Sequence, residues 1–208
     1  MRFDYTSKPA HPHKIFTVIN DFVNNNISLE RQTIPFPSGL TCAEFMNYLE
    51  TAEPITVQVT FHVKYGKECC AWDCQDFENP DCEIDMNFAS LMTCGSQAVR
   101  ENIISRCPTA KGFSRMTFVL LHEIGHFMTA EEAEEEEEIS PDEEFERMLN
   151  AMMIANTEIE FERIVQKYHY SKQEEMLATD WAINFLADPD NRKKTKAFER
   201  EFFKAWRG

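Results

Sequence analysis

Residues 121–128 read L-H-E-I-G-H-F-M and constrain the fold of this chain more than any other stretch. His122 and His126 are four residues apart, so in a helix they lie one above the other on the same face. Two imidazoles placed in this way can bind one Zn²⁺ ion as adjacent ligands. Glu123 lies about 100° round the helix, where it can accept a proton from a metal-activated water instead of binding the metal. The motif therefore predicts a helix that carries part of a zinc site.

The surrounding residues favour a helix over about 114–129. On a helical wheel, one group of apolar side chains falls opposite His122: Leu120, Ile124, Phe127 and Met128. We expect this apolar face to pack on a sheet, with the histidine pair pointing away from it. Chance is the alternative explanation for so short a motif, but chance does not require this arrangement of faces.

The chain has 208 residues, which predicts one domain spanning 1–208. Within that domain we expect an N-terminal helical segment at 1–50, an acidic loop insertion at 131–146 and a C-terminal helix at 190–208. The run 131–138 is almost all glutamate, and like charges this dense are typical of a solvated loop. A long helix is expected to follow at about 140–167.

The net charge of −15 leaves no surplus of Lys or Arg to neutralise phosphates. This argues against direct binding to nucleic acid or to an anionic membrane surface. No apolar run approaches the roughly 20 residues of a membrane span, and no stretch resembles a signal peptide. We therefore expect a cytoplasmic protein. The seven cysteines are odd in number and no export signal is seen, so free thiols are expected. A second zinc site among the four cysteines of 69–82 is the alternative, but they lack the paired C-x-x-C spacing of a structural site.

Two stretches, 55–63 and 82–88, alternate apolar and polar residues, which predicts strands with one buried face. Gly66 and residues 73–81 between them predict turns or a long hairpin.

The third metal ligand is expected from a helix at 171–187. Glu174 is the expected partner of Ser171 in a capping box. Glu175 has no capping role, and we predict it as the third ligand. It shares a helix face with three small residues, Ala178, Thr179 and Ala182, which would let this helix approach the first one closely. Gly125 would help this approach. Asp180 lies about 140° away from Glu175 on the wheel, where it is either an outer-shell partner or exposed to solvent.

The stretch R-M-T-F-V-L-L-H-E-I-G-H (115–126) resembles the R-x-x-F-x-x-x-H-E-x-G-H signature of ImmA/IrrE-type metallopeptidases. The stretch E-E-M-L-A-T-D-W-A-I-N-F-L (174–186) resembles the family's downstream helix, with Thr179 where Asn or Asp is usual. The resemblance implies a small zincin-like domain of gluzincin type. It places the strand at 82–88 at the edge of the sheet, where a substrate peptide could add as a further strand. It also implies that His122 and His126 bind zinc and that Glu123 is the catalytic base. Several members occur in phages and mobile elements and cleave a repressor, and a phage-encoded member would act in the host cytoplasm.

Together, the motifs and the resemblance predict an α+β fold, mostly helical, with a short sheet packed on the H-E-x-x-H helix. They predict a zinc-dependent endopeptidase that cleaves a protein substrate through a metal-activated water. A donor for the developing oxyanion is also expected. Tyr168, His169 and Tyr170 are candidates by position alone, and the alternative is that they are surface residues at a helix end.

A second hypothesis makes the chain a non-catalytic, acidic interaction protein with a structural or degenerate zinc site. The charge of −15 suits a basic partner. The ligand set separates the two hypotheses, because a structural zinc is closed by four protein ligands whereas a catalytic zinc keeps one position for water.

Overall fold

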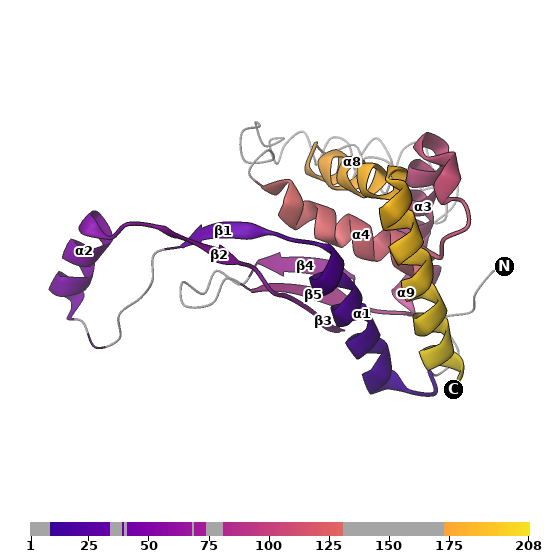
Figure 1. Ribbon diagram of the computed structural model, residues 1–208, viewed down its shortest axis with the longest axis horizontal. Coiled ribbons are helices and arrows are strands. Elements are labelled where there is room, and N and C mark those ends of the chain that lie inside the picture. The colour runs from indigo at the N-terminus through magenta and orange to yellow at the C-terminus, as the bar shows by residue number, and fades with distance from the viewer. Residues whose placement is uncertain (1–8, 34–38, 40, 68, 74–80, 131–172) are drawn as a thin grey trace, which may run out of the picture.

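The computed structural model describes residues 9–33, 39, 41–67, 69–73, 81–130 and 173–208. Figure 1 shows helices gathered around a small sheet, with a two-stranded arm that projects from this body and carries a helix at its tip. The acidic segment 131–146 and the helix expected at 140–167 lie outside the described residues.

Helices and strands alternate in the first half of the chain, and helices fill the described part of the second half. This mixture agrees with the predicted α+β class. In order, the elements are α1 (Pro12–Asn26), β1 (Glu30–Thr33), α2 (Cys42–Thr51), β2 (Ile55–Gln58), β3 (Phe61–Tyr65), β4 (Cys70–Asp73), β5 (Cys82–Met86), α3 (Cys94–Arg106), α4 (Arg115–Met128), α8 (Gln173–Ala187) and α9 (Pro189–Arg207).

The single strand expected over 55–63 is wrong, because the chain divides there into two strands of different sheets. β2 pairs antiparallel with β1 in the arm, from Glu30 opposite Gln58 to Thr33 opposite Ile55. β3 belongs to the sheet of the body. Ile55 is 47% exposed although it lies on the expected apolar face. The alternation of residue types continues across the break, so periodicity alone cannot locate it.

Among the described strands, the sheet of the body has the order β3-β5-β4. β3 and β5 run parallel, from Phe61 opposite Cys82 to Tyr65 opposite Met86, so they do not form the expected hairpin. β4 pairs antiparallel with β5, from Cys70 opposite Asp85 to Asp73 opposite Cys82. The prediction that 82–88 is an edge strand is therefore wrong, because β4 lies outside β5 in the sheet. β4 comes from the segment that connects β3 to β5.

The outer edge of β3 is covered by asparagine side chains of α1. The Nδ2 of Asn24 donates to Phe61 O at 2.9 Å, and the Phe61 N–H donates to Asn24 Oδ1 at 2.9 Å. Asn20 makes the same pair of bonds with Val63, both at 2.8 Å. Asn20 and Asn24 are four residues apart and lie on one helix face. Their amides therefore satisfy the strand as a neighbouring backbone would.

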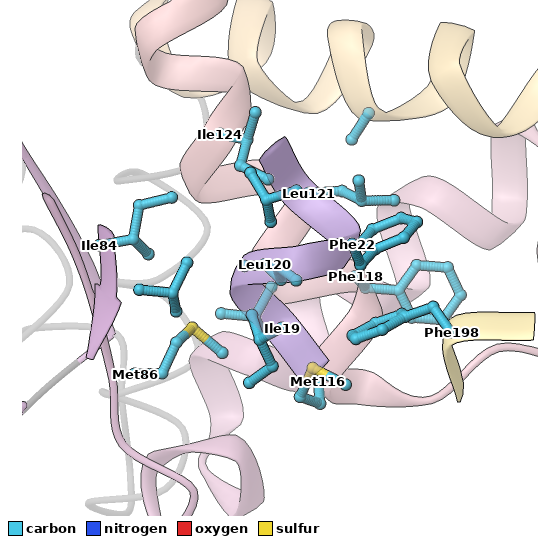
Figure 2. Packing of buried hydrophobic residues seen from close by; sticks show 14 of the residues in the cluster. Ile19, Phe22, Ile84, Met86, Met116, Phe118, Leu120, Leu121, Ile124 and Phe198 are labelled. Carbon is cyan, nitrogen blue, oxygen red and sulfur yellow. The ribbon is translucent and has the colours of Figure 1, made fainter. Parts of the chain in front are cut away.

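The core lies between the sheet, α1, α4 and α9. Figure 2 shows Ile84 and Met86 of β5 beside side chains of α1 and α4. Phe22 of α1 stacks on Phe198 of α9 with 4.2 Å between ring centroids. Nearly all of α4 is buried, including its histidine side, because α8 covers that side. This burial places the predicted site between two helices.

The described helices include none that is both long and apolar enough to cross a membrane. Within the same residues, Cys107 is a free thiol, as expected.

Candidate metal centre

The N-terminus of α4 is fixed by a carboxylate from the far end of the chain. Glu199 of α9 is only 9% exposed, and its Oε1 accepts from the Ser114 N–H at 2.6 Å and from the Thr117 hydroxyl at 2.5 Å. The Ser114 hydroxyl caps the helix by accepting from the Thr117 N–H at 3.3 Å. A negative charge at a helix N-terminus is also favoured by the helix dipole. The helix that carries the motif thus has a fixed start.

α4 and α8 approach each other at Gly125. A Cβ atom placed on Gly125 would lie 2.3 Å from the carbonyl oxygen of Ala178 and 2.8 Å from its Cα. Ala178 and Ala182 are fully buried. The expectation that small residues allow a close approach of the two helices is therefore confirmed. This approach brings the first turn of α8 over the histidine pair.

Three side chains from the two helices meet at this contact. The Nε2 of His122 lies 2.9 Å from Glu175 Oε2, and the Nε2 of His126 lies 3.7 Å from Glu175 Oε1. His122 and Glu175 are buried, whereas the side chain of His126 is 25% exposed. One ligand atom from each residue lies within 4.8 Å of the others. The cluster can hold a metal ion.

The donor set and its spacing fit a zinc ion. Two imidazole nitrogens and a carboxylate oxygen are ligands of the catalytic zinc class. Around a tetrahedral zinc with bonds of about 2.05 Å, neighbouring ligand atoms are roughly 3.4 Å apart. The separation from His122 Nε2 to Glu175 Oε2, 2.9 Å, and that from His126 Nε2 to Glu175 Oε1, 3.7 Å, lie on either side of that value.

Within the described ranges, no fourth His, Cys, Asp or Glu joins the group formed by His122, His126 and Glu175. A structural zinc would need one. In those ranges, the group therefore has three members.

Glu123 follows His122 directly on α4 and is 9% exposed. A buried carboxylate beside a cation site has its charge balanced by the metal. This position suits the predicted acceptor of a proton. Glu123 does not belong to the ligand group.

Asp180 lies away from the cluster. Its carboxylate forms an ion pair with Arg106 of α3, and the side chain is 42% exposed. The side chain is thus partly exposed and paired with α3, and the two roles that the wheel left open for Asp180 stay predictions. Tyr168, His169 and Tyr170 lie outside the described residues, so their role as oxyanion donors stays a prediction.

Thr179 contacts the site in a way that the sequence analysis missed. Its Oγ1 lies 3.2 Å from Nδ1 of His122, and the residue is 1% exposed. In the sequence, Thr179 stood out only as a small residue and as a replacement for the Asn or Asp that is usual in the family. The signal in the sequence was its spacing from Glu175. Residues four apart share a helix face, so Thr179 lies on the same side of α8 as the predicted ligand.

The chain matches no protein-family model, and no significant match was found among curated proteins or solved structures. The resemblance to ImmA/IrrE-type metallopeptidases therefore depends on the two motifs in 115–126 and 174–186. The geometry of the cluster carries the functional argument.

Proposed function

We propose that this protein is a zinc-dependent endopeptidase. One observation carries the proposal: the ligand atoms of His122, His126 and Glu175 converge within 4.8 Å, and the buried Glu123 directly follows His122 on α4. Glu123 is unnecessary for a structural zinc, whereas hydrolysis needs a proton acceptor beside the metal. The described ligand set of three also leaves a coordination position for water.

The residues divide the chemistry among them. A zinc ion bound by the cluster would lower the pKa of a water molecule towards about 7 and polarise a peptide carbonyl. Glu123 accepts the proton of the attacking water and then donates it to the leaving amine. His122 and Glu175 are shielded from solvent, and the partly exposed His126 marks the side from which a substrate reaches the cluster.

The backbone of β4 supports a peptide substrate. Cys82 donates its N–H to Thr60 O, just before β3, and the Met86 C=O accepts from the Gly66 N–H, just after β3. The backbone groups of the alternate residues of β5 that lie between Cys82 and Met86 in register therefore face β4. By the antiparallel register, the N–H and C=O groups of Ala71 and Asp73 then point to the outer edge of β4. β4 also contacts α4. An extended peptide could therefore add to this edge beside the site.

The test compares wild-type protein with Glu123→Gln. Wild type should bind about one zinc per chain by elemental analysis and cut members of a proteome-derived peptide library, with new N-termini read by mass spectrometry. Glu123→Gln should keep the metal but lose roughly 10²–10⁴-fold in cleavage rate. Glu174→Gln is the matched control, because Glu174 is an exposed carboxylate next to a ligand. It should cleave like wild type.

Two results would overturn the proposal. Stoichiometric zinc that survives alanine replacement of both His122 and His126 would reject the site. Cleavage by Glu123→Gln at the wild-type rate would reject the mechanism. Wild-type protein that binds zinc tightly but cuts nothing in the library would favour the alternative, an acidic protein of net charge −15 that binds a basic partner.

A further inference from the structure

His122 is contacted at both ring nitrogens by residues of one helix, α8. Its Nε2 lies 2.9 Å from Glu175 Oε2, and its Nδ1 lies 3.2 Å from Thr179 Oγ1. The exposed fractions of the three residues are 3%, 6% and 1%. The imidazole is therefore held on its two sides in a place that bulk water does not reach.

The geometry of the two helices explains this double contact. Glu175 and Thr179 are four residues apart, so they project from the same face of α8. Ala178 lies between them in the sequence and touches Gly125 through its backbone. The close approach at Gly125 brings α8 near enough to α4 for the short side chain of Thr179 to reach the imidazole ring of His122.

A histidine ligand must be in the correct tautomer. A neutral imidazole offers one nitrogen lone pair to a metal and carries its hydrogen on the other nitrogen. The Nε2 of His122 faces Glu175, as the Nε2 of His126 does, so a metal ion bound among the three residues would take Nε2 as its ligand atom. The hydrogen must then lie on Nδ1. A buried N–H without an acceptor costs about 1–3 kcal/mol.

We propose that Thr179 is a positioning residue of the metal site, whose hydroxyl oxygen accepts the hydrogen bond from His122 Nδ1–H. This bond holds the ring in the tautomer and orientation that present Nε2 to zinc. The inference depends on the metal site of the proposed function but not on peptide cleavage. A hydroxyl also meets this need without adding a third buried negative charge to Glu123 and Glu175.

The experiment measures zinc affinity of the full chain by competition with a chromophoric chelator. Thr179→Val has nearly the same shape but no acceptor, and it should weaken zinc binding about 10–100-fold, as loss of an outer-shell partner does. Thr179→Ser restores the hydroxyl and should bind nearly as tightly as wild type. Thr195→Val is the matched control, because Thr195 is a fully buried threonine on α9 whose hydroxyl donates to Asn191 O. It should not change the affinity.

A second measurement reads the tautomer directly. In zinc-loaded wild type and Thr179→Ser, ¹⁵N NMR of His122 should show the hydrogen on Nδ1, with slow exchange against solvent. In Thr179→Val this hydrogen should exchange faster. A purely structural role for Thr179 would not change this signal. If Thr179→Val fails to fold, the wild-type and Thr179→Ser spectra still decide.

The outcomes separate this inference from the proposed function. Wild-type affinity in Thr179→Val, or a hydrogen on Nε2 in the loaded protein, would overturn the inference and leave peptide cleavage unaffected. A protein that passes these tests but cuts no peptide would overturn only the proposed function. Wild-type protein with no affinity for zinc would overturn both.

Discussion

Gly125 shows how one residue controls the site. Its Cα lies where any side chain would collide with the backbone of Ala178, and backbone atoms cannot move aside as the end of a flexible side chain can. The contact sets the distance between α4 and α8, and with it the positions of Glu175 and Thr179 relative to His122.

At this scale we predict that Gly125→Ala destabilises the protein. Alanine is about 1 kcal/mol better than glycine within a helix, but the added Cβ would lie 2.3 Å from Ala178 O. Overpacking of a tight core costs about 1–3 kcal/mol or more, so the collision should exceed the helical gain. Chemical denaturation should show reduced stability, and chelator competition should show weaker zinc binding.

Gly112→Ala is the control for this prediction. A Cβ on Gly112 meets nothing within 4 Å, so stability and zinc binding should stay near the wild-type values. If Gly125→Ala were as stable as wild type, α4 and α8 could move apart without loss of stability, which would contradict the prediction.

Among the elements, α1 has a role that its apolar face does not reveal. It packs its buried face on the core and also closes the outer edge of β3 through Asn20 and Asn24. An exposed strand edge is a template for pairing with another chain. Within the described residues, α1 therefore protects one edge of the sheet and leaves the other, at β4, open.

At the element scale we predict that Asn24→Ala destabilises the protein by about 1–3 kcal/mol, because the Phe61 N–H and C=O lose their partners. The double variant with Asn20→Ala should also self-associate, as measured by light scattering. Asn26→Ala is the control, since its amide donates to Phe22 O within α1 and not to the strand. A monomeric double variant with wild-type stability would contradict the edge-covering role.

For the whole molecule, the candidate metal centre joins α4 from the middle of the chain to α8 near its end. A metal ion bound there by both helices would bind the folded state and not the unfolded chain. Folding and metal binding are then linked, and removal of the metal lowers stability.

At this scale we predict that a strong chelator lowers the thermal unfolding midpoint of zinc-loaded protein. The stabilisation lost is about 2.7 kcal/mol when free zinc had been present at 100 times its Kd. Scanning calorimetry measures the shift. His122→Ala should unfold at the same temperature with and without chelator, and an equal shift in that variant would place the stabilising ion elsewhere.

Local periodicity was enough for much of the site. The spacing of His122, Glu123 and His126 is a property of one helix, and so is the common face of Glu175 and Ala178. The start of α4 near Ser114 also followed from residue types at short spacing. These features depend on contacts within a turn or two of helix, which the order of residues determines.

Only the tertiary structure decided which strands pair and which side chains complete the site. The alternation over 55–63 and 82–88 predicted strands, but the break after Gln58, the parallel pairing of β3 with β5 and the outer place of β4 depend on long-range contacts. Asp180 and Thr179 are neighbours in sequence, yet Arg106 of α3 pairs with the first and His122 of α4 meets the second. The sequence by itself determined the His122–Glu123–His126 helix, because helical spacing is local. The packing of α3 and α4 against α8 decided which of these two neighbouring residues of α8 contacts the motif helix.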